Sequence, residues 1–304
     1  MKRGLLVTGA TGFIGGHVVR AALARGDAVW AWSRNAQRAR RRLPDAVRVV
    51  EQLAEIPATE TIDAIVNLAG APVIGPPWTR RRRRVLIDSR VLTTAAVLEW
   101  CATRSQRPAV LVSASAIGFY GPAGDRWLDE NSPAQKVFQS QLCVAREAAA
   151  NAAPRLGIRA VNLRIGLVLG ADGGIFTRLL LPAKLGLAAR IGDGRQWMSW
   201  IHVDDLVRVV DLAIENPALN GAINAVSPEP IRQGDFQREL TRALHRPLWL
   251  VVPGAALRLA LGEMAELLVQ GQRVAPRRLL EAGFEFRQPA LGRAIEELLR
   301  PGRS

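Results

Sequence analysis

The sequence predicts an α/β fold, with a doubly wound parallel sheet followed by a smaller, mostly helical C-terminal lobe. Three observations lead to this prediction. Short apolar, β-branched runs alternate with amphipathic helical stretches through the first half of the 304 residues. A glycine-rich turn joins the first run to the first helical stretch. The alternation fades after Gly170, and mainly helical patterns follow.

Strands and helices can be placed one after another along the first half. Buried parallel strands are near-continuous apolar runs, and the helices between them carry one apolar face. The predicted strands are residues 4–8, 28–32, 48–50, 64–68, 109–113 and 160–164. The predicted helices are residues 13–25, 36–43, 80–102 and 135–153.

The turn after the first strand has the spacing G-x-x-G-x-x-G. Gly9 allows the sharp turn, Gly12 lets the backbone approach a pyrophosphate, and Gly15 lets the helix pack closely on the strand. The first N–H groups of the helix and its positive dipole end then face the phosphates. We therefore predict a Rossmann-type dinucleotide site formed by Gly9, Thr11, Gly12, Phe13, Ile14 and Gly15.

The end of the second strand indicates which dinucleotide is bound. A carboxylate there would bind the ribose 2′-OH and repel a 2′-phosphate, but this strand ends in Ser33-Arg34-Asn35. Ser33 can donate a hydrogen bond, and Arg34 offers a charged fork for phosphate, which favours NADP over NAD. The alternative is that Arg34 is an ordinary surface arginine.

The fourth strand ends in small residues, which lets its backbone run close beside the cofactor. Leu68, Ala69 and Gly70 are the predicted contacts, although an ordinary exit from a strand explains the pattern equally well on its own.

The second half is predicted to contain helices at residues 235–244, 255–270 and 290–299. Another should run from Asp204-Asp205 through Ile214, with one of these aspartates in its N-cap region. We predict that residues 1–170 form the NADP-binding Rossmann domain and that 200–226 return to it. Residues 171–199 and 227–304 would form a substrate-binding lobe over the carboxyl ends of the strands, where such sheets bind ligands.

The composition argues against several classes of protein. The only two cysteines, Cys101 and Cys143, lack metal-ligand spacing, so we expect no metal site and a reducing, cytoplasmic location. No uncharged apolar run reaches 18 residues, and the first residues do not read as a signal peptide, so we expect no membrane segment. The net charge of +14 reflects an abundance of arginine at solvated helix positions, and the arginine runs at 38–42 and 80–84 have no interleaved aromatic residues, so we expect no nucleic-acid partner.

These residues resemble the extended short-chain dehydrogenase/reductases, the group that contains nucleotide-sugar epimerases. The matching segments are residues 8–15, Asn67-Leu68-Ala69-Gly70, Ser113-Ala114-Ser115 leading to Tyr120-Gly121, Leu163-Arg164, and Trp200-Ile201-His202-Val203-Asp204-Asp205. Trp78-Thr79, Ser89-Arg90 with Thr93, and Gly271-Gln272-Arg273-Val274 with Pro276 further resemble one atypical subgroup. Its members are the epimerase-family proteins, or sugar-nucleotide epimerases, with a C-terminal domain of unknown function. The resemblance covers nearly the whole chain.

The proton relay of the wider superfamily is missing. That relay is a Tyr-x-x-x-Lys pair on the helix after the serine strand, in which the lysine lowers the pKa of the tyrosine. The only tyrosine, Tyr120, lies in a turn, with Gly124 four residues later. On the expected helix, Cys143 and Glu147 stand in place of the tyrosine and lysine. The subgroup shares this spacing but usually has Trp before the Glu, where this chain has Arg146. Near residues 188–189, where the subgroup is expected to have a glycine pair, this chain has Ala188-Ala189.

The resemblance implies Ser115 as the serine that binds a substrate oxygen, with Ser113 as the competing choice. It also implies cofactor contacts from Ser89, Ser113 and Arg164, although Arg164 could instead meet a substrate phosphate or simply close its strand. Cys143 could act as a weak acid or be a small buried hydrophobe. Glu147 could orient a polar substrate, as could Arg146, or be a solvated carboxylate.

His202 is expected to be structural rather than a general base. Two functions follow. One is an NADP-dependent oxidoreductase or epimerase with an altered relay, acting on a polar small molecule, with nucleotide-linked substrates among the candidates. The other is a non-catalytic NADP(H)-binding sensor or partner-binding protein. The resemblance also suggests a homodimer through the helices at 80–102 and 135–153.

Overall fold

The computed structural model describes residues 2–300 and has a seven-stranded, fully parallel sheet at its centre. The strand order is β12-β7-β5-β4-β1-β2-β3. The strands are β1 (Gly4–Thr8), β2 (Ala28–Trp32), β3 (Arg48–Val50), β4 (Ala64–Asn67), β5 (Val110–Ala116), β7 (Arg159–Ile165) and β12 (Gly221–Ala225). The helices beside them are α1 (Phe13–Ala24), α2 (Ala36–Arg40), α3 (Arg80–Ala102), α4 (Phe138–Ala150) and α6 (Val203–Glu215). The predicted fold class is therefore confirmed.

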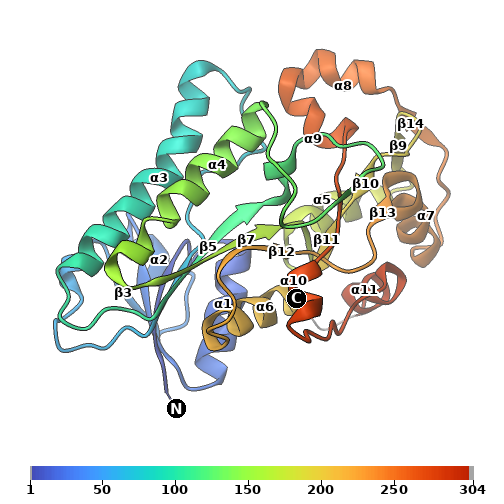
Figure 1. Ribbon diagram of the computed structural model, residues 1–304. Coiled ribbons are helices and arrows are strands. Elements are labelled where there is room, and N and C mark those ends of the chain that lie inside the picture. The colour runs from blue at the N-terminus through green and yellow to red at the C-terminus, as the bar shows by residue number, and fades with distance from the viewer. Residues whose placement is uncertain (1, 301–304) are drawn as a thin grey trace.

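Helices cover both faces of the sheet because its strands alternate their apolar side chains between two cores. Leu5 and Val7 of β1 pack in one core with residues of α1 and α6. Leu6, between them, packs in the other core with residues of α3 and the end of α4. Figure 1 shows α3 and α4 on one side of the sheet and α1 and α6 on the other. The strand order changes direction between β1 and β4, since β2 and β3 follow on one side of β1 and β4, β5 and β7 on the other, and such sheets open a crevice for ligands at this point.

The C-terminal region is mainly helical and has a core of its own. Trp200, Phe236 and Ile295 pack there with residues of α5. The helices are α5 (Gly174–Lys184), α7 (Gln233–Ala243), α8 (Gly254–Leu261), α9 (Glu266–Val269), α10 (Arg277–Glu281) and α11 (Leu291–Leu298). Four short strand pairs accompany them: β6 (Trp127–Leu128) with β15 (Arg273–Val274), β8 (Leu167–Gly170) with β11 (Trp200–His202), β9 (Ala189–Ile191) with β14 (Leu250–Val252), and β10 (Trp197–Met198) with β13 (Ile231–Arg232). Leu279 and Phe284, late in the chain, return to the core of the large sheet.

Three details differ from the sequence-based expectations. The sheet has a seventh strand, β12, that the apolar patterns did not reveal. The helix expected at 255–270 is broken into α8, a 3₁₀ turn and α9, because Gly262 adopts a left-handed φ of 57° and ends α8. The N-cap of α6 is His202 rather than an aspartate. Nowhere between residues 2 and 300 is a helix both long and apolar enough to cross a membrane.

Candidate active site

The glycine loop between β1 and α1 has the geometry of a phosphate cradle. Gly9 has a φ of 69°, and its carbonyl oxygen accepts a hydrogen bond from the Gly12 N–H at 3.0 Å. A Cβ on Gly15 would lie 2.2 Å from that same oxygen, so only glycine permits this packing. Gly12 is the N-cap of α1 and has no side chain to cap it. The first N–H groups of α1 are therefore open to an anion, and the loop fits a dinucleotide diphosphate.

The end of β4 is held beside this loop by a buried hydrogen-bond chain. The Thr8 hydroxyl donates to Asn67 Oδ1 at 2.7 Å and accepts from the Ala69 N–H at 3.2 Å. A Cβ on Gly9 would lie 2.9 Å from the Leu68 carbonyl carbon. Leu68 and Ala69 therefore form one wall of the glycine loop, and their contact with the cofactor stays a prediction.

Three other predicted cofactor residues, Ser33, Arg34 and Ser89, differ in exposure and in hydrogen bonding. Arg34 is exposed, and within residues 2–300 its guanidinium has no hydrogen bond or ion pair, while the neighbouring Ser33 hydroxyl donates to the Asn35 carbonyl at 3.3 Å. Ser89 Oγ accepts from the Ala71 N–H at 3.0 Å and so ties the segment after Gly70 to α3.

The side chains of the glycine loop differ in exposure. Thr11 is exposed, whereas Phe13 and Ile14 are half-buried and pack against the core of the sheet. The Phe13 ring is so close to the segment after β8 that a Cβ on Gly173 would lie 2.4 Å from it. Phe13 therefore joins the glycine loop to the start of α5.

A row of polar side chains crosses the carboxyl ends of three strands. Strand register places Arg164 of β7 between Ser115 of β5 and Asn224 of β12. Glu147, from α4, accepts the Ser115 hydroxyl at 2.7 Å. It also forms a two-pronged ion pair with Arg164, at 3.0 Å to Nε and 2.9 Å to Nη2. Glu147 is 6% exposed and Arg164 is 5% exposed, so this is a buried pair rather than a solvated carboxylate.

Tyr120 completes the row as a structural residue. Its hydroxyl donates to Asn224 Oδ1 at 2.6 Å and accepts from Arg164 Nη1 at 3.0 Å, and the residue is fully buried. Burial raises the pKa of Tyr120 to about 12, although the nearby Arg164 opposes this rise. Tyr120 is thus held protonated within the protein, in agreement with the argument that it lies in the wrong element for a proton relay.

Of the two candidate serines, Ser115 is the one connected to the α4 residues. The Ser113 hydroxyl is fully buried and has no hydrogen-bond partner among the described residues. Cys143 is 7% exposed and lies against Ser115 and the backbone of Ala116. Burial, together with the charge of Glu147, raises the pKa of Cys143 to about 11. At neutral pH this thiol keeps its proton, so it can donate a hydrogen bond but is a poor nucleophile.

Ser115 and Cys143 face a cavity of about 350 Å³ between the sheet and the C-terminal region. Its walls come from the ends of β5 and β7, from α3, α4, α5 and α7, and from the segment before β15. Most lining side chains are apolar. Glu147 and Arg164 are not among the lining residues, so they support the cavity wall from behind. A larger hollow of about 490 Å³, around Trp127 and Arg277, contains none of the predicted site residues.

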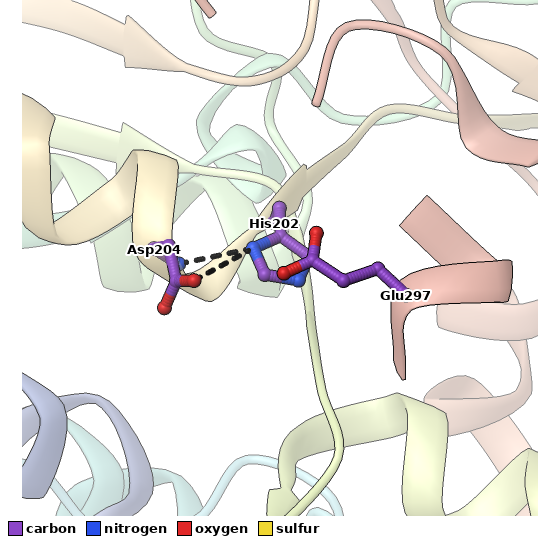
Figure 2. Close-up of side chains that lie close together, drawn as sticks. All are labelled: His202, Asp204 and Glu297. Carbon is purple, nitrogen blue, oxygen red and sulfur yellow. Dashed lines mark hydrogen bonds and ion pairs between the residues drawn. The ribbon is translucent and has the colours of Figure 1, made fainter. Parts of the chain in front are cut away.

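His202 lies outside this cavity lining, at the start of α6. Its Nδ1 accepts the Asp204 N–H at 3.2 Å, which caps the helix. Figure 2 shows Asp204 on one side of the imidazole and Glu297, from α11, on the other. The three side chains each offer one atom of a kind that binds metals, all within 4.8 Å of one another. His202 thus joins α6 to α11, and the expectation of no metal site stays a prediction.

Comparison with known proteins gives consistent matches over nearly the whole length. Residues 5–225 match the model of the NAD dependent epimerase/dehydratase family, and residues 252–298 match a domain of unknown function, DUF1731. The chain is 36% identical to the chloroplastic epimerase family protein SDR39U1 homolog of Arabidopsis thaliana, covering 97% of this chain and 86% of that protein. It is 34% identical to the epimerase family protein YfhF of Bacillus subtilis, covering 97% of each. The crystal structure of human epimerase family protein SDR39U1 (isoform 2) with NADPH superposes with a TM-score of 0.86, at 32% identity over 97% of this chain and 98% of that one.

Proposed function

Because the chain belongs to the NAD dependent epimerase/dehydratase family, we propose that it binds NADP(H) and acts as an oxidoreductase or epimerase on a polar small molecule. The observation that carries this proposal is the position of Ser115 and Cys143 on one wall of the cavity between the sheet and the C-terminal region. That wall lies at the carboxyl ends of the strands, the same edge of the sheet as the glycine loop.

Several features support NADP as the cofactor. The human relative was crystallised with NADPH, and residues 9–15 form a cradle that fits a diphosphate. Arg34 is exposed at the tip of β2 and free to meet a 2′-phosphate. When bound, the cofactor supplies or accepts a hydride. The residues of this chain then have to bind the substrate oxygen and donate or accept its proton.

Ser115 and Cys143 are suited to that task. Each carries a proton at neutral pH and lies at the cavity wall. Glu147 accepts a hydrogen bond from the Ser115 hydroxyl and so fixes the direction of that hydroxyl. In this proposal Cys143 donates the proton that the missing tyrosine would have supplied, and Glu147 with Arg164 is a positioning pair. A cytoplasmic location and a homodimer through α3 and α4 remain part of the proposal, and no nucleic-acid partner is proposed.

Turnover can be tested with purified protein, NADPH and a panel of keto-sugars and other carbonyl compounds, by following nicotinamide absorbance and product stereochemistry. We expect at least one compound to be reduced or epimerised. The Ser115→Ala variant should lose about 100-fold or more in kcat while binding NADPH normally, and Ser113→Ala serves as the matched control. Tight NADPH binding with no reaction on any compound would favour the alternative, a non-catalytic NADP(H)-binding sensor, which the missing Tyr-x-x-x-Lys pair supports.

The cofactor preference is tested with the Arg34→Asp variant. Removing one charge-assisted hydrogen bond and adding a repulsive carboxylate should weaken NADPH binding by about 100-fold relative to NADH. Fluorescence titration with both cofactors measures this ratio. Arg41→Asp, an equal charge change on a nearby exposed residue, should leave the ratio unchanged. Equal losses for NADPH and NADH in Arg34→Asp would contradict the phosphate role.

A further inference from the structure

The charged side chains that line the cavity are all positive. Among the described residues that line it, Arg90 and Arg146 are charged, and there is no aspartate, glutamate, lysine or histidine. The rest of the lining is apolar or carries neutral amide, hydroxyl, thiol or indole groups. Both arginines lie on the wall that also holds Cys143, so two positive charges face the place where a substrate would react.

Arg146 is a buried cation whose hydrogen-bond donors are only partly satisfied within the described residues. It is 6% exposed, and its Nη2 donates to the Asn67 carbonyl at 2.8 Å. Its Nε is buried without a hydrogen-bond partner among residues 2–300. The adjacent carboxylate, Glu147, is already held by both prongs of Arg164. Arg146 therefore has an unused donor and no anion within the described part of the protein.

Arg90 is bound only to neutral groups. Its guanidinium donates to the Leu86 carbonyl at 2.8 Å and to the Ala71 carbonyl at 3.0 Å, and no acidic partner is present in the described chain. Burial, and next the positive charge of Arg90, lowers the pKa of Arg146 to about 9. Arg146 still carries its proton at neutral pH. The two guanidinium groups thus repel one another across a small region that an anion would neutralise.

We propose that Arg90 and Arg146 form an anion subsite, and that the polar part of the substrate is one anionic group, a carboxylate or a phosphate, carried on an otherwise apolar body. A buried guanidinium without an anion is costly, and a ligand oxygen that accepts the free Arg146 donor would remove that cost. The apolar remainder of the cavity suits a hydrocarbon or aromatic body better than a nucleotide diphosphate sugar. This inference rests on the proposed function for the identity of the substrate, but the anion subsite can be measured without turnover.

The test uses three unreactive probes on the NADPH-bound protein: benzoate, phenyl phosphate and neutral benzamide. They share an apolar ring and differ in the attached group, so the preferred anion identifies the chemistry of the natural ligand. Calorimetric titration should show at least one anionic probe binding about ten-fold or more tightly than benzamide. In Arg146→Gln and in Arg90→Gln this preference should fall to about that of benzamide. Arg84→Gln removes the same charge from an exposed position of α3 and should keep the preference.

NADPH affinity is measured in the same variants, to distinguish a subsite for the substrate anion from a site for the cofactor diphosphate and to check folding. Unchanged NADPH binding together with the lost preference supports a subsite for the substrate. Equal binding of all three probes to the wild-type protein, or a preference that survives in Arg146→Gln, would overturn the proposal. So would a large loss of NADPH affinity in Arg146→Gln with the probe preference intact, because the arginine would then serve the cofactor diphosphate. If the carbonyl panel shows no turnover while the anion preference holds, the proposed reaction fails and the subsite stands.

Discussion

Replacing Glu147 with glutamine is expected to lower the free energy of unfolding by about 3–5 kcal/mol. Glu147 is the only carboxylate that pairs with the buried Arg164 within residues 2–300, and it also accepts the Ser115 hydroxyl. The amide is almost the same size, so the loss reflects a guanidinium left buried without an anion rather than altered packing. Urea unfolding, followed by circular dichroism, measures the change.

A double-mutant cycle provides the control. Arg164→Gln alone should also destabilise the protein, because it leaves the Glu147 carboxylate buried. The combined Glu147→Gln and Arg164→Gln variant should be markedly less destabilised than the sum of the two single variants, since no charge then remains buried. Simple additivity of the two single effects would show that the pair is not energetically coupled.

Gly15→Ala is expected to have the second large effect, and this one falls on cofactor binding. The new Cβ would lie 2.2 Å from the Gly9 carbonyl oxygen, so the loop or the first turn of α1 must move. The N–H groups that face the diphosphate would move with it. We expect NADPH affinity to fall by about 100-fold and stability to fall by about 1–3 kcal/mol, as measured by fluorescence titration and thermal unfolding.

The next residue offers a matched control. A Cβ on Gly16 would be 3.5 Å from its nearest neighbour, an atom of the flexible Arg20 side chain. Gly16→Ala should therefore leave NADPH binding unchanged and stabilise α1 slightly, by about 0.5–1 kcal/mol, because alanine favours the helix. Similar losses in both variants would show that the loop geometry does not depend on Gly15 in particular.

The fold could be predicted well where a local pattern determines the structure. β1, β2, β3 and α3 have the bounds expected from the sequence, because each is an apolar or amphipathic run between clear turns. β12 escaped prediction because its sequence, Gly-Ala-Ile-Asn-Ala, has one β-branched residue and no strand pattern. Pairing with β7 makes it a strand. At β12 the tertiary contacts stabilise the strand, although its residues have little intrinsic β propensity.

The candidate site was predictable in part. Register on one helix was enough to bring Cys143 and Glu147 together, and motif order brought Ser115 to them. The partner of Glu147 was not foreseen. Arg164 comes from another strand, and an ion pair between residues distant in sequence leaves no local signal. The cation pair of Arg90 and Arg146 depends in the same way on how α3 packs on α4.

The Ser115–Glu147–Arg164 arrangement also constrains how the site can evolve. Converting Glu147 to the lysine of the standard relay would set two cations side by side in a buried space, with Arg164 losing its anion at the same step. Converting Cys143 to tyrosine alone would add a phenol without the cation that tunes it. The standard relay is therefore not reached from this site by one replacement, because Arg164 needs a new partner whenever Glu147 is removed. Each single replacement is expected to lower the free energy of unfolding or to leave the new phenol without its cation, so the positions have to be changed together.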